Sequence, residues 1–501
     1  MPLDTVKSVK PVDEIDLIDL KAVDHSGPDH VADVKVNLDK PKFNSRVISK
    51  ETYKDYLSFV STRNKEFSSI SSTNPKLTTL DLQSSYQCLG RQTDIHAVRR
   101  RPCRFKNVCY HRPSLQFQYY NPSNDPVFYD SMLGPLYKFQ VDNQPGFIQV
   151  NALPYMDVSW FTPMVTKTSP VSQNDAVWVQ DTTAIFASWS REYNFGHFVF
   201  EELASAYTAL VRFGIYPMGG NSRKPKVQLL DLRHQPNNKR YLSLLNDFMG
   251  AFSTPFPVRD VRIFMDDVAK EKGGAELVCF HDLVVSSATQ SFLSPHDEYQ
   301  MGTEPIWAQY RSDILLSHGI DPLLKPTRHQ MLILKKTKSL YKSGENRVHF
   351  RDIVNFDEMV NHIKLKFGSL FDIIVFDPSV EGITMTRQLE MISKTTILVT
   401  CPGGISMLVP FLPPQSHAIV LDYYESLDNG LVSTRQGESV TMEASLWNVF
   451  PHVYKHYYQI MDPDEEIVPD FEGASDTRED FSVKVNPVRM EYMINVAISS
   501  I

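Results

Sequence analysis

Apolar and polar positions follow a regular alternation over the second half of the chain. Short β-branched or apolar runs predict strands, and apolar residues at helical spacing between them predict helices. The predicted strands are Gln330–Leu334, Asp372–Phe376, Ile397–Thr400 and His417–Leu421, and the predicted helices are Phe356–Lys366, Thr384–Ile392 and a short one over Ile405–Phe411. Successive strand–helix units predict a parallel, doubly wound sheet, and such sheets bind ligands at the carboxyl ends of their strands.

The first half of the chain changes its pattern at Asn194. Before it, from Leu80 to about Trp189, short strand-like runs broken by Pro, Asn, Gly and Asp predict a strand-rich region. After it, apolar residues at helical spacing predict a helix over Gly196–Val211, and strands and helices then alternate. These further elements are strands at Val227–Leu232, Val258–Phe264 and Leu277–Val285 and helices at Tyr241–Ala251 and within Glu304–His318.

A chain of 501 residues is too long for one ordinary core, so we expect two domains. We divide it into an irregular N-terminal arm (1–80), an N-terminal domain (81–310), a C-terminal domain (311–480) and a C-terminal tail (481–501). Within the third part, Trp447–Met461 has the pattern of a further helix, followed by an acidic loop over Asp462–Glu466. The residues after that loop show an irregular pattern.

Composition narrows the class of protein. A hydrophobic content of 42% and a charged content of 22% are those of a globular protein. The formal net charge of −8 argues against a nucleic-acid binder that relies on bulk positive charge. No run of 18 apolar residues predicts a membrane span, and the first twenty residues lack the apolar core of a signal peptide.

Three of the five cysteines cluster in the strand-rich region, at Cys88, Cys103 and Cys109. No Cys-x-x-Cys pair is present, which argues against a structural zinc site. Cys103 and Cys109 are close enough in sequence to be bridged through a turn, with Cys88 as a competing partner. We expect at least one disulfide here, and hence a lumenal protein of the secretory pathway whose anchor is not visible; free thiols would favour a cytoplasmic protein.

The helix predicted after Asn194 carries the first candidate for chemistry. His197 and Glu201 are four residues apart and share one helical face, and Asn194 suits the N-cap. A histidine one turn before a carboxylate is suited to act as a general base. The alternative is an ordinary helix start with an exposed His–Glu pair.

The second candidate is an anion site in the C-terminal domain. Gly403 and Gly404 lie between a predicted strand and a short helix, where backbone amides up to Ile405 and Ser406 face an anion. A cationic run follows the strand that ends at Leu334, and it comprises Lys335, Lys336, Lys338, Lys342, Arg347 and Arg351. Lysines at such a strand end suit a diphosphate. The alternatives are a tight turn without a ligand and a solvated basic loop.

Metal chemistry has little support in the sequence. The pair Asp462 and Asp464 lies in an acidic run away from any predicted strand end, so we interpret it as a solvated loop rather than a cation site. The motifs of P-loop nucleotide binding, of dinucleotide binding, of serine hydrolases and of zinc proteases are absent. We therefore expect no metal ligands and no cofactor.

These motifs, in this order, resemble those of the family 61 glycosyltransferases, which include β-1,2-xylosyltransferases, xylan arabinosyl- and xylosyltransferases and N-acetylglucosamine transferases. Asn194 to Glu201 is similar to the family's Asn-x-x-His-x-x-x-Asp/Glu helix. Thr396 to Pro414 is similar to its strand, glycine-rich turn and Phe-Leu-Pro-Pro ending, and Cys103 to Tyr110 to its Cys-rich strand. The sequence departs from the family pattern in two ways: Pro402 stands at the turn histidine, and lysines 335, 336 and 338 replace the usual arginines.

The resemblance implies a GT-B-like architecture, with two Rossmann-like domains facing across a cleft. It implies inverting transfer of xylose, N-acetylglucosamine or arabinose from a UDP-sugar, held by the C-terminal domain, to a hydroxyl of a glycan or glycoprotein on the N-terminal domain, without a metal. His197 or Glu201 would be the base, and the donor would bind at Lys336, Lys338, Arg347, Gly403, Gly404, Ile405 and Ser406. The changes at Pro402 and the lysines leave an alternative, a catalytically inactive binding or scaffold protein of the same fold.

Overall fold

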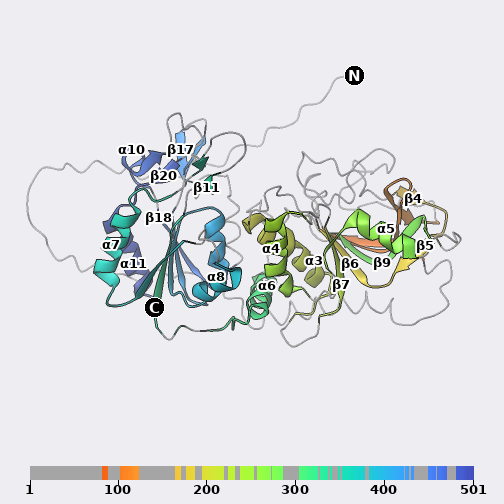
Figure 1. Cartoon of the computed structure of the whole chain (residues 1–501), viewed down its shortest axis with the longest axis horizontal. Coiled ribbons are helices and arrows are strands. Elements are labelled where there is room, and N and C mark those ends of the chain that lie inside the picture. The colour runs from red at the N-terminus through yellow and green to blue at the C-terminus, as the bar shows by residue number, and fades with distance from the viewer. Residues whose placement is uncertain are drawn as a thin grey trace, which may run out of the picture. The chain divides into compact units, whose positions relative to one another are not determined.

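The protein contains two sheets of α/β type, which are seen in a computed structural model (Figure 1). The structure describes residues 82–88, 102–122, 164–170, 176–186, 195–218, 224–231, 237–252, 257–271, 273–285, 304–324, 326, 328–336, 339–340, 348–349, 352–377, 383–421, 424–427, 430–433, 450–458, 460–470 and 481–501. All of these belong to one compact unit, residues 46–501. The predicted arm over 1–80 lies outside the described residues.

The first sheet has nine described strands in the order β4-β3-β2-β9-β6-β7-β8, with β1 paired to β2 and β5 to β9. Its strands are β1 (Ser85–Cys88), β2 (Cys103–His111), β3 (Gln116–Tyr120), β4 (Met164–Thr166), β5 (Ala176–Val179), β6 (Thr182–Phe186), β7 (Val227–Asp231), β8 (Arg259–Asp260) and β9 (Leu277–Val285). Strands β8, β7, β6 and β9 are mutually parallel and, numbered along the chain, stand in the doubly wound order 3-2-1-4.

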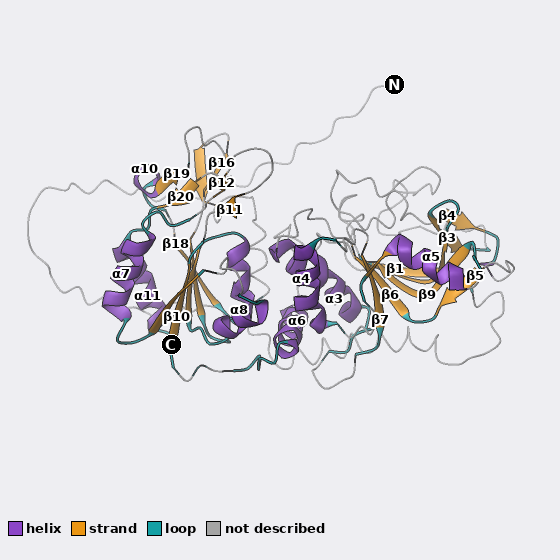
Figure 2. Cartoon of the chain, in the orientation of Figure 1, coloured by secondary structure: helices purple, strands orange, loops and turns teal. Residues whose placement is uncertain are grey.

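Helices cover both faces of this first sheet. The helical segments are η4 (His197–Leu203), α3 (Ala204–Arg212), α4 (Lys239–Phe248), η5 (Met249–Ala251), α5 (Val261–Glu271) and α6 (Glu304–Ser317). Apolar residues of α5 pack on one face with those of β2, β3 and β9. The other face packs against η4, α3, α4 and α6, of which α3, α4 and α6 lie side by side in Figure 2.

The second sheet is parallel throughout its described strands, in the order β13-β10-β14-β15-β18. Its strands are β10 (Gln330–Leu334), β13 (Asp372–Phe376), β14 (Ile397–Thr400), β15 (His417–Leu421) and β18 (Tyr454–Tyr458). Numbered along the chain, the order reads 2-1-3-4-5, the second common doubly wound arrangement. Strands β14 and β15 are buried along their whole length, because a parallel sheet is covered on both faces.

Helices α7 (Phe356–Phe367) and α11 (Pro487–Ile498) cover one face of the second sheet, and α8 (Met385–Ile392) and η6 (Gly404–Phe411) cover the other. The second of these faces shares one continuous core with the helix-covered face of the first sheet. The predicted domain boundary at residue 310 falls inside α6. Short two-stranded pieces lie outside the sheets, namely β11 (Ser339–Leu340) with β12 (Val348–His349), β16 (Tyr424–Leu427) with β17 (Gly430–Ser433), and β19 (Ile467–Pro469) with β20 (Phe481–Val483).

Three predicted elements are wrong. In the segment predicted as a strand over Val258–Phe264, only β8 is extended and α5 begins at Val261, because the Asp260 carboxylate accepts hydrogen bonds from the amides of Arg262 and Ile263 and caps a helix. The described part of Trp447–Met461 contains the fifth parallel strand, β18, instead of a helix. The tail predicted to be irregular contains α11, which begins at Pro487 after the cap residue Asn486.

The expectation of at least one disulfide at the cysteine cluster is confirmed, but the pairing of Cys103 with Cys109 is wrong. Cys109 is disulfide-bonded to Cys279, 170 positions further along the chain. The two residues are direct register partners in the antiparallel β2–β9 ladder, so the bridge joins neighbouring strands of the sheet. Cys103 is disulfide-bonded as well, and its register partner in β1 is Cys88. Cys401 is buried and is not part of a disulfide.

Candidate functional site

The helix that carries His197 begins with a π-helical turn. In η4 the chain is wound so that the amide of Ala204 donates to the carbonyl of Val199, five residues back. A π-turn inside a helix is rare and is frequent at functional sites. This helix is the first one after β6, and β6 lies beside β9 where the strand order of the first sheet reverses. Ligands of doubly wound sheets bind at such a reversal, beyond the carboxyl ends of the strands.

The π-turn changes which carboxylate accompanies His197. In an α-helix, residues four apart share a face, which singled out Glu201. Because the hydrogen bond here joins residues five apart, Glu202, five positions after His197, becomes a second candidate beside Glu201. His197 is half-buried and the Glu202 side chain is fully buried, whereas the side chain of Glu201 and the predicted cap Asn194 lie outside the described residues. Sequence reasoning missed Glu202 because hydrophobic spacing does not reveal a π-turn.

The glycine turn follows β14 as predicted, and its backbone requires glycine. Gly403 has φ 104° and ψ −162°, a region that essentially only glycine occupies. The turn leads into η6, which is a 3₁₀-helix rather than an α-helix and contains Pro410. Both the amide and the hydroxyl of Ser406 donate to the Gly403 carbonyl, over 2.9 and 2.7 Å. Ser406 therefore stabilises the turn, and the amides of Gly404 and Ile405 are the ones placed to face an anion.

The lysines after β10 start from the same edge of the second sheet. Strands β10 and β14 are adjacent and parallel, with Ile333 paired to Val399, so Lys335 and the glycine turn follow neighbouring strand ends. The order 2-1-3-4-5 reverses between these two strands. Most of the residues predicted to bind the UDP-sugar therefore lie at one reversal point, namely Lys336, Gly403, Gly404, Ile405 and Ser406. The other two, Lys338 and Arg347, lie outside the described residues.

A carboxyl group lies near the lysine pair. Burial raises the pKa of Asp352, and the positive charges of Lys336 and Lys335 oppose this rise. The ammonium group of Lys335 also lies 5.4 Å from the ring centre of Phe356, within cation–π range. Lys335 therefore lies against α7, and the charges of both lysines act on the Asp352 carboxyl.

The helix that carries His197 (η4) and the helix that follows the glycine turn (η6) are in contact. The rings of Phe200, in η4, and Phe411, at the end of η6, lie 5.8 Å apart between centroids. Both rings also lie within ring-contact distance of another aromatic residue, Phe200 of Phe450 and Phe411 of Phe248. The structure thus joins the His197 helix and the helix of the glycine turn through one aromatic core.

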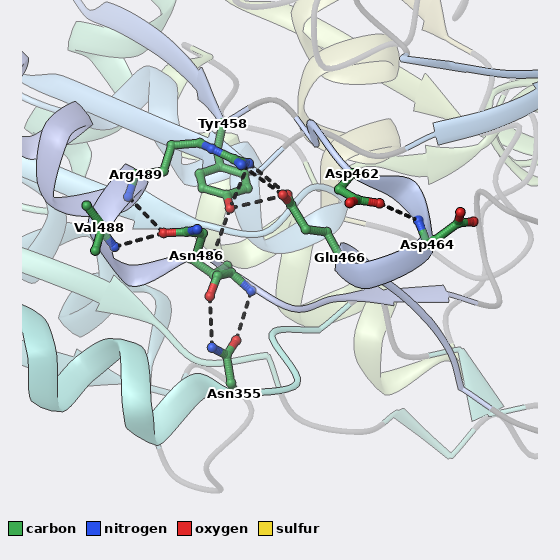
Figure 3. Close-up of polar contacts among 9 residues, drawn as sticks. Asn355, Tyr458, Asp462, Asp464, Glu466, Asn486, Val488 and Arg489 are labelled. Atoms are coloured by element: carbon green, nitrogen blue, oxygen red, sulfur yellow. Dashed lines mark hydrogen bonds and ion pairs between the residues drawn. The ribbon is translucent and has the colours of Figure 1, made fainter. Parts of the chain in front are cut away.

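The acidic run after β18, predicted as a solvated loop, instead contains a short helix and has a structural role (Figure 3). Asp462 caps the short helix α10 (Pro463–Glu466) by accepting from the Asp464 amide. Glu466 is buried and forms a two-pronged ion pair with Arg489 of α11, with both N–O distances at 2.8 Å. Within the described ranges, no group of three or more His, Cys, Asp or Glu side chains is arranged to hold a metal ion.

Neither the family models nor the curated proteins contain a match to the chain. None of the helices that the structure describes is long and apolar enough to cross a membrane.

Proposed function

We propose that the protein is an inverting, metal-independent glycosyltransferase that moves a sugar from a UDP-sugar to a hydroxyl of a glycan or glycoprotein. One observation carries this proposal: each of the two predicted motifs follows a strand at the reversal point of a doubly wound sheet, and the two motif helices touch. A pair of Rossmann-like domains with GT-B-like architecture would use these two points for acceptor and donor. The sequence resemblance supplies the sugar classes, which are xylose, N-acetylglucosamine and arabinose.

The chemistry needs one base and a stabilised leaving group. We assign the base to His197, with Glu201 as the next candidate and the buried Glu202 as a further carboxylate of the same helix. The amides of Gly404 and Ile405 and the ammonium of Lys336 would stabilise the UDP diphosphate. Because these groups are cationic or amide donors, transfer should persist in excess chelator.

The disulfides support an oxidising compartment for this activity. Cys109 and Cys279 are bridged between the central strands of the first sheet, and such bridges persist mainly in secreted and lumenal proteins. We therefore propose the lumen of the secretory pathway as the place of action.

Calorimetric titration of UDP into the Gly403→Asp variant tests the donor site. The aspartate would impose a Cβ at φ 104° and a negative charge beside the diphosphate, so UDP binding should be lost. Gly274→Asp is the matched control, because Gly274 also has a positive φ (94°), open space around it, and a place in the turn between α5 and β9. Unchanged UDP affinity in Gly403→Asp would place the nucleotide elsewhere.

A catalytically inactive binding protein is the second candidate. Pro402, which is buried, occupies the position of the family's turn histidine. Hydrolysis of a panel of UDP-sugars separates the two candidates: UDP binding without turnover of any donor would favour the binding protein.

A further inference from the structure

Helix α6 contacts both η4, which carries His197, and η6, which follows the glycine turn, through two consecutive residues. The hydroxyl of Tyr310 donates to the carbonyl of Val199 over 2.8 Å, and this is the carbonyl that closes the π-turn. Tyr310 is 1% exposed, so the bond is shielded from water. The π-turn carbonyl thus has two donors, the amide of Ala204 from its own helix and the hydroxyl from α6.

The next residue, Arg311, binds η6, the helix that follows the glycine turn. Its guanidinium donates to the carbonyls of Pro410 and Leu412, both over 2.8 Å, at the end of η6. It also donates to Pro322, in the segment that leaves α6, over 3.2 Å. Arg311 is 6% exposed, and burial lowers its pKa to about 10, so it stays charged at neutral pH. A charged donor at the carbonyl end of a helix is favourable.

We propose that Tyr310 and Arg311 are positioning residues that hold the His197 π-turn and the glycine-turn helix in one fixed arrangement. That this arrangement serves catalysis rests on the proposed function. The coupling itself, in which Tyr310 and Arg311 hold η4 and η6 together, does not. Adjacent helical residues point in directions about 100° apart, which lets one helix bind two different partners at one level.

Neighbouring groups support a rigid junction at this place. His452 lies against the same carbonyl of Pro410, with its Nε2 atom 3.1 Å away. On the other side, the Trp307 ring packs edge-on against both Tyr310 and Phe450. At the end of α6, His318 contacts the Asp247 carbonyl of α4 and the Thr386 hydroxyl of α8, at 2.7 and 2.8 Å. Helix α6 therefore binds elements of both sheets along its length.

Hydrogen exchange of the full-length protein tests the coupling without any substrate. Tyr310→Phe removes one donor from the Val199 carbonyl and should speed exchange over residues 197–204 by roughly threefold to tenfold. Tyr458→Phe is the matched control, since its hydroxyl accepts from the Asn486 amide at the start of α11. It should speed exchange around Asn486 and leave 197–204 unchanged. Wild-type exchange over 197–204 in Tyr310→Phe would overturn the proposal.

Kinetics then test the positioning role. Tyr310→Phe should lower kcat about tenfold with unchanged UDP affinity, because it loosens the helix that carries His197 and leaves the glycine turn in place. Arg311→Lys keeps the charge but cannot span three carbonyls, so it should weaken UDP affinity as well as kcat. Arg489→Lys, which alters the ion pair with Glu466, is the control and should lower only the melting temperature.

These outcomes distinguish a failure of the proposed function from a failure of the positioning role. If the wild type neither binds UDP nor turns over UDP-sugars, the proposed function fails, and the exchange experiment still decides the coupling. If the wild type is active and both α6 variants keep wild-type kcat and UDP affinity while melting lower, Tyr310 and Arg311 are merely structural and the positioning proposal is wrong.

Discussion

His197 is the residue on which the proposed chemistry depends most directly. It is half-buried in the first turn of η4, and the next residue, Phe198, is fully buried. His197→Ala should reduce turnover by about 10²- to 10⁴-fold, the usual contribution of a general base, with UDP affinity unchanged. Steady-state rates and UDP calorimetry measure the two effects.

The melting temperature decides between a catalytic and a structural histidine. A structural role predicts that His197→Ala loses stability together with activity. Nearly full turnover in the variant would exclude His197 as the base, and Glu201→Gln would be the next substitution to measure.

At the scale of single elements, the sequence predicted correctly those strands and helices whose residue pattern depends on a single physical rule. Strands such as Ile397–Thr400 are apolar on both faces because a parallel sheet is covered on both sides, and the structure confirms them. Strand β18 was missed because Lys455 and His456 make an edge strand look polar. Helix α11 was missed because its apolar residues are not confined to one face, since Val488 and Tyr492 are exposed, and because its start depends on a cap. The π-turn leaves no trace in hydrophobic spacing.

The cap of α11 gives a prediction of its own. The Asn486 side chain accepts hydrogen bonds from the amides of Val488 and Arg489, at 3.0 and 3.1 Å. Asn486→Ala removes this acceptor and should lower the free energy of unfolding by about 0.5–2 kcal/mol. Denaturant titration measures the change. Asn486→Asp keeps an acceptor and should stay near wild type; equal losses in both variants would contradict a capping role.

The disulfide between β2 and β9 was assigned to the wrong partner for a reason of topology. Cys279 is remote in sequence from Cys109, and only the sheet order brings β9 beside β2. Because the bridge closes a loop of 170 residues, Cys279→Ser should lower stability by about 2–5 kcal/mol. Thermal melts with and without reductant measure this: the wild type should lose stability in reductant toward the level of the variant.

Peptide mapping without reduction tests the same bridge in the native source. A linked peptide pair containing Cys109 and Cys279 is expected. Free thiols at both positions would contradict the bridge and would remove the support for a lumenal compartment.

At the scale of the whole molecule, two histidines are buried beside other basic side chains, His452 at the core shared by the two sheets and His417 on the face of the second sheet that α11 covers. His452 lies beside Arg311 and Lys455, and burial together with their positive charges lowers its pKa to about 3. His417 is 1% exposed and lies 2.9 Å from His456 between ring nitrogens; burial and that neighbour lower its pKa to about 4. Both histidines are neutral in the folded protein at neutral pH.

These histidines should make the protein sensitive to mild acid. The unfolded chain binds their protons below pH 6.5, while the folded protein resists protonation down to about pH 3 for His452 and about pH 4 for His417. Since the unfolded state binds more protons in this window, stability is complete above pH 6.5 and falls as the pH drops, by at most about 1.4 kcal/mol per pH unit and per histidine. The melting temperature should therefore fall between pH 6.5 and 4. His452→Gln cannot titrate and retains an amide that can donate to Pro410, so its profile should be flatter than that of the wild type; parallel profiles would show that His452 does not contribute.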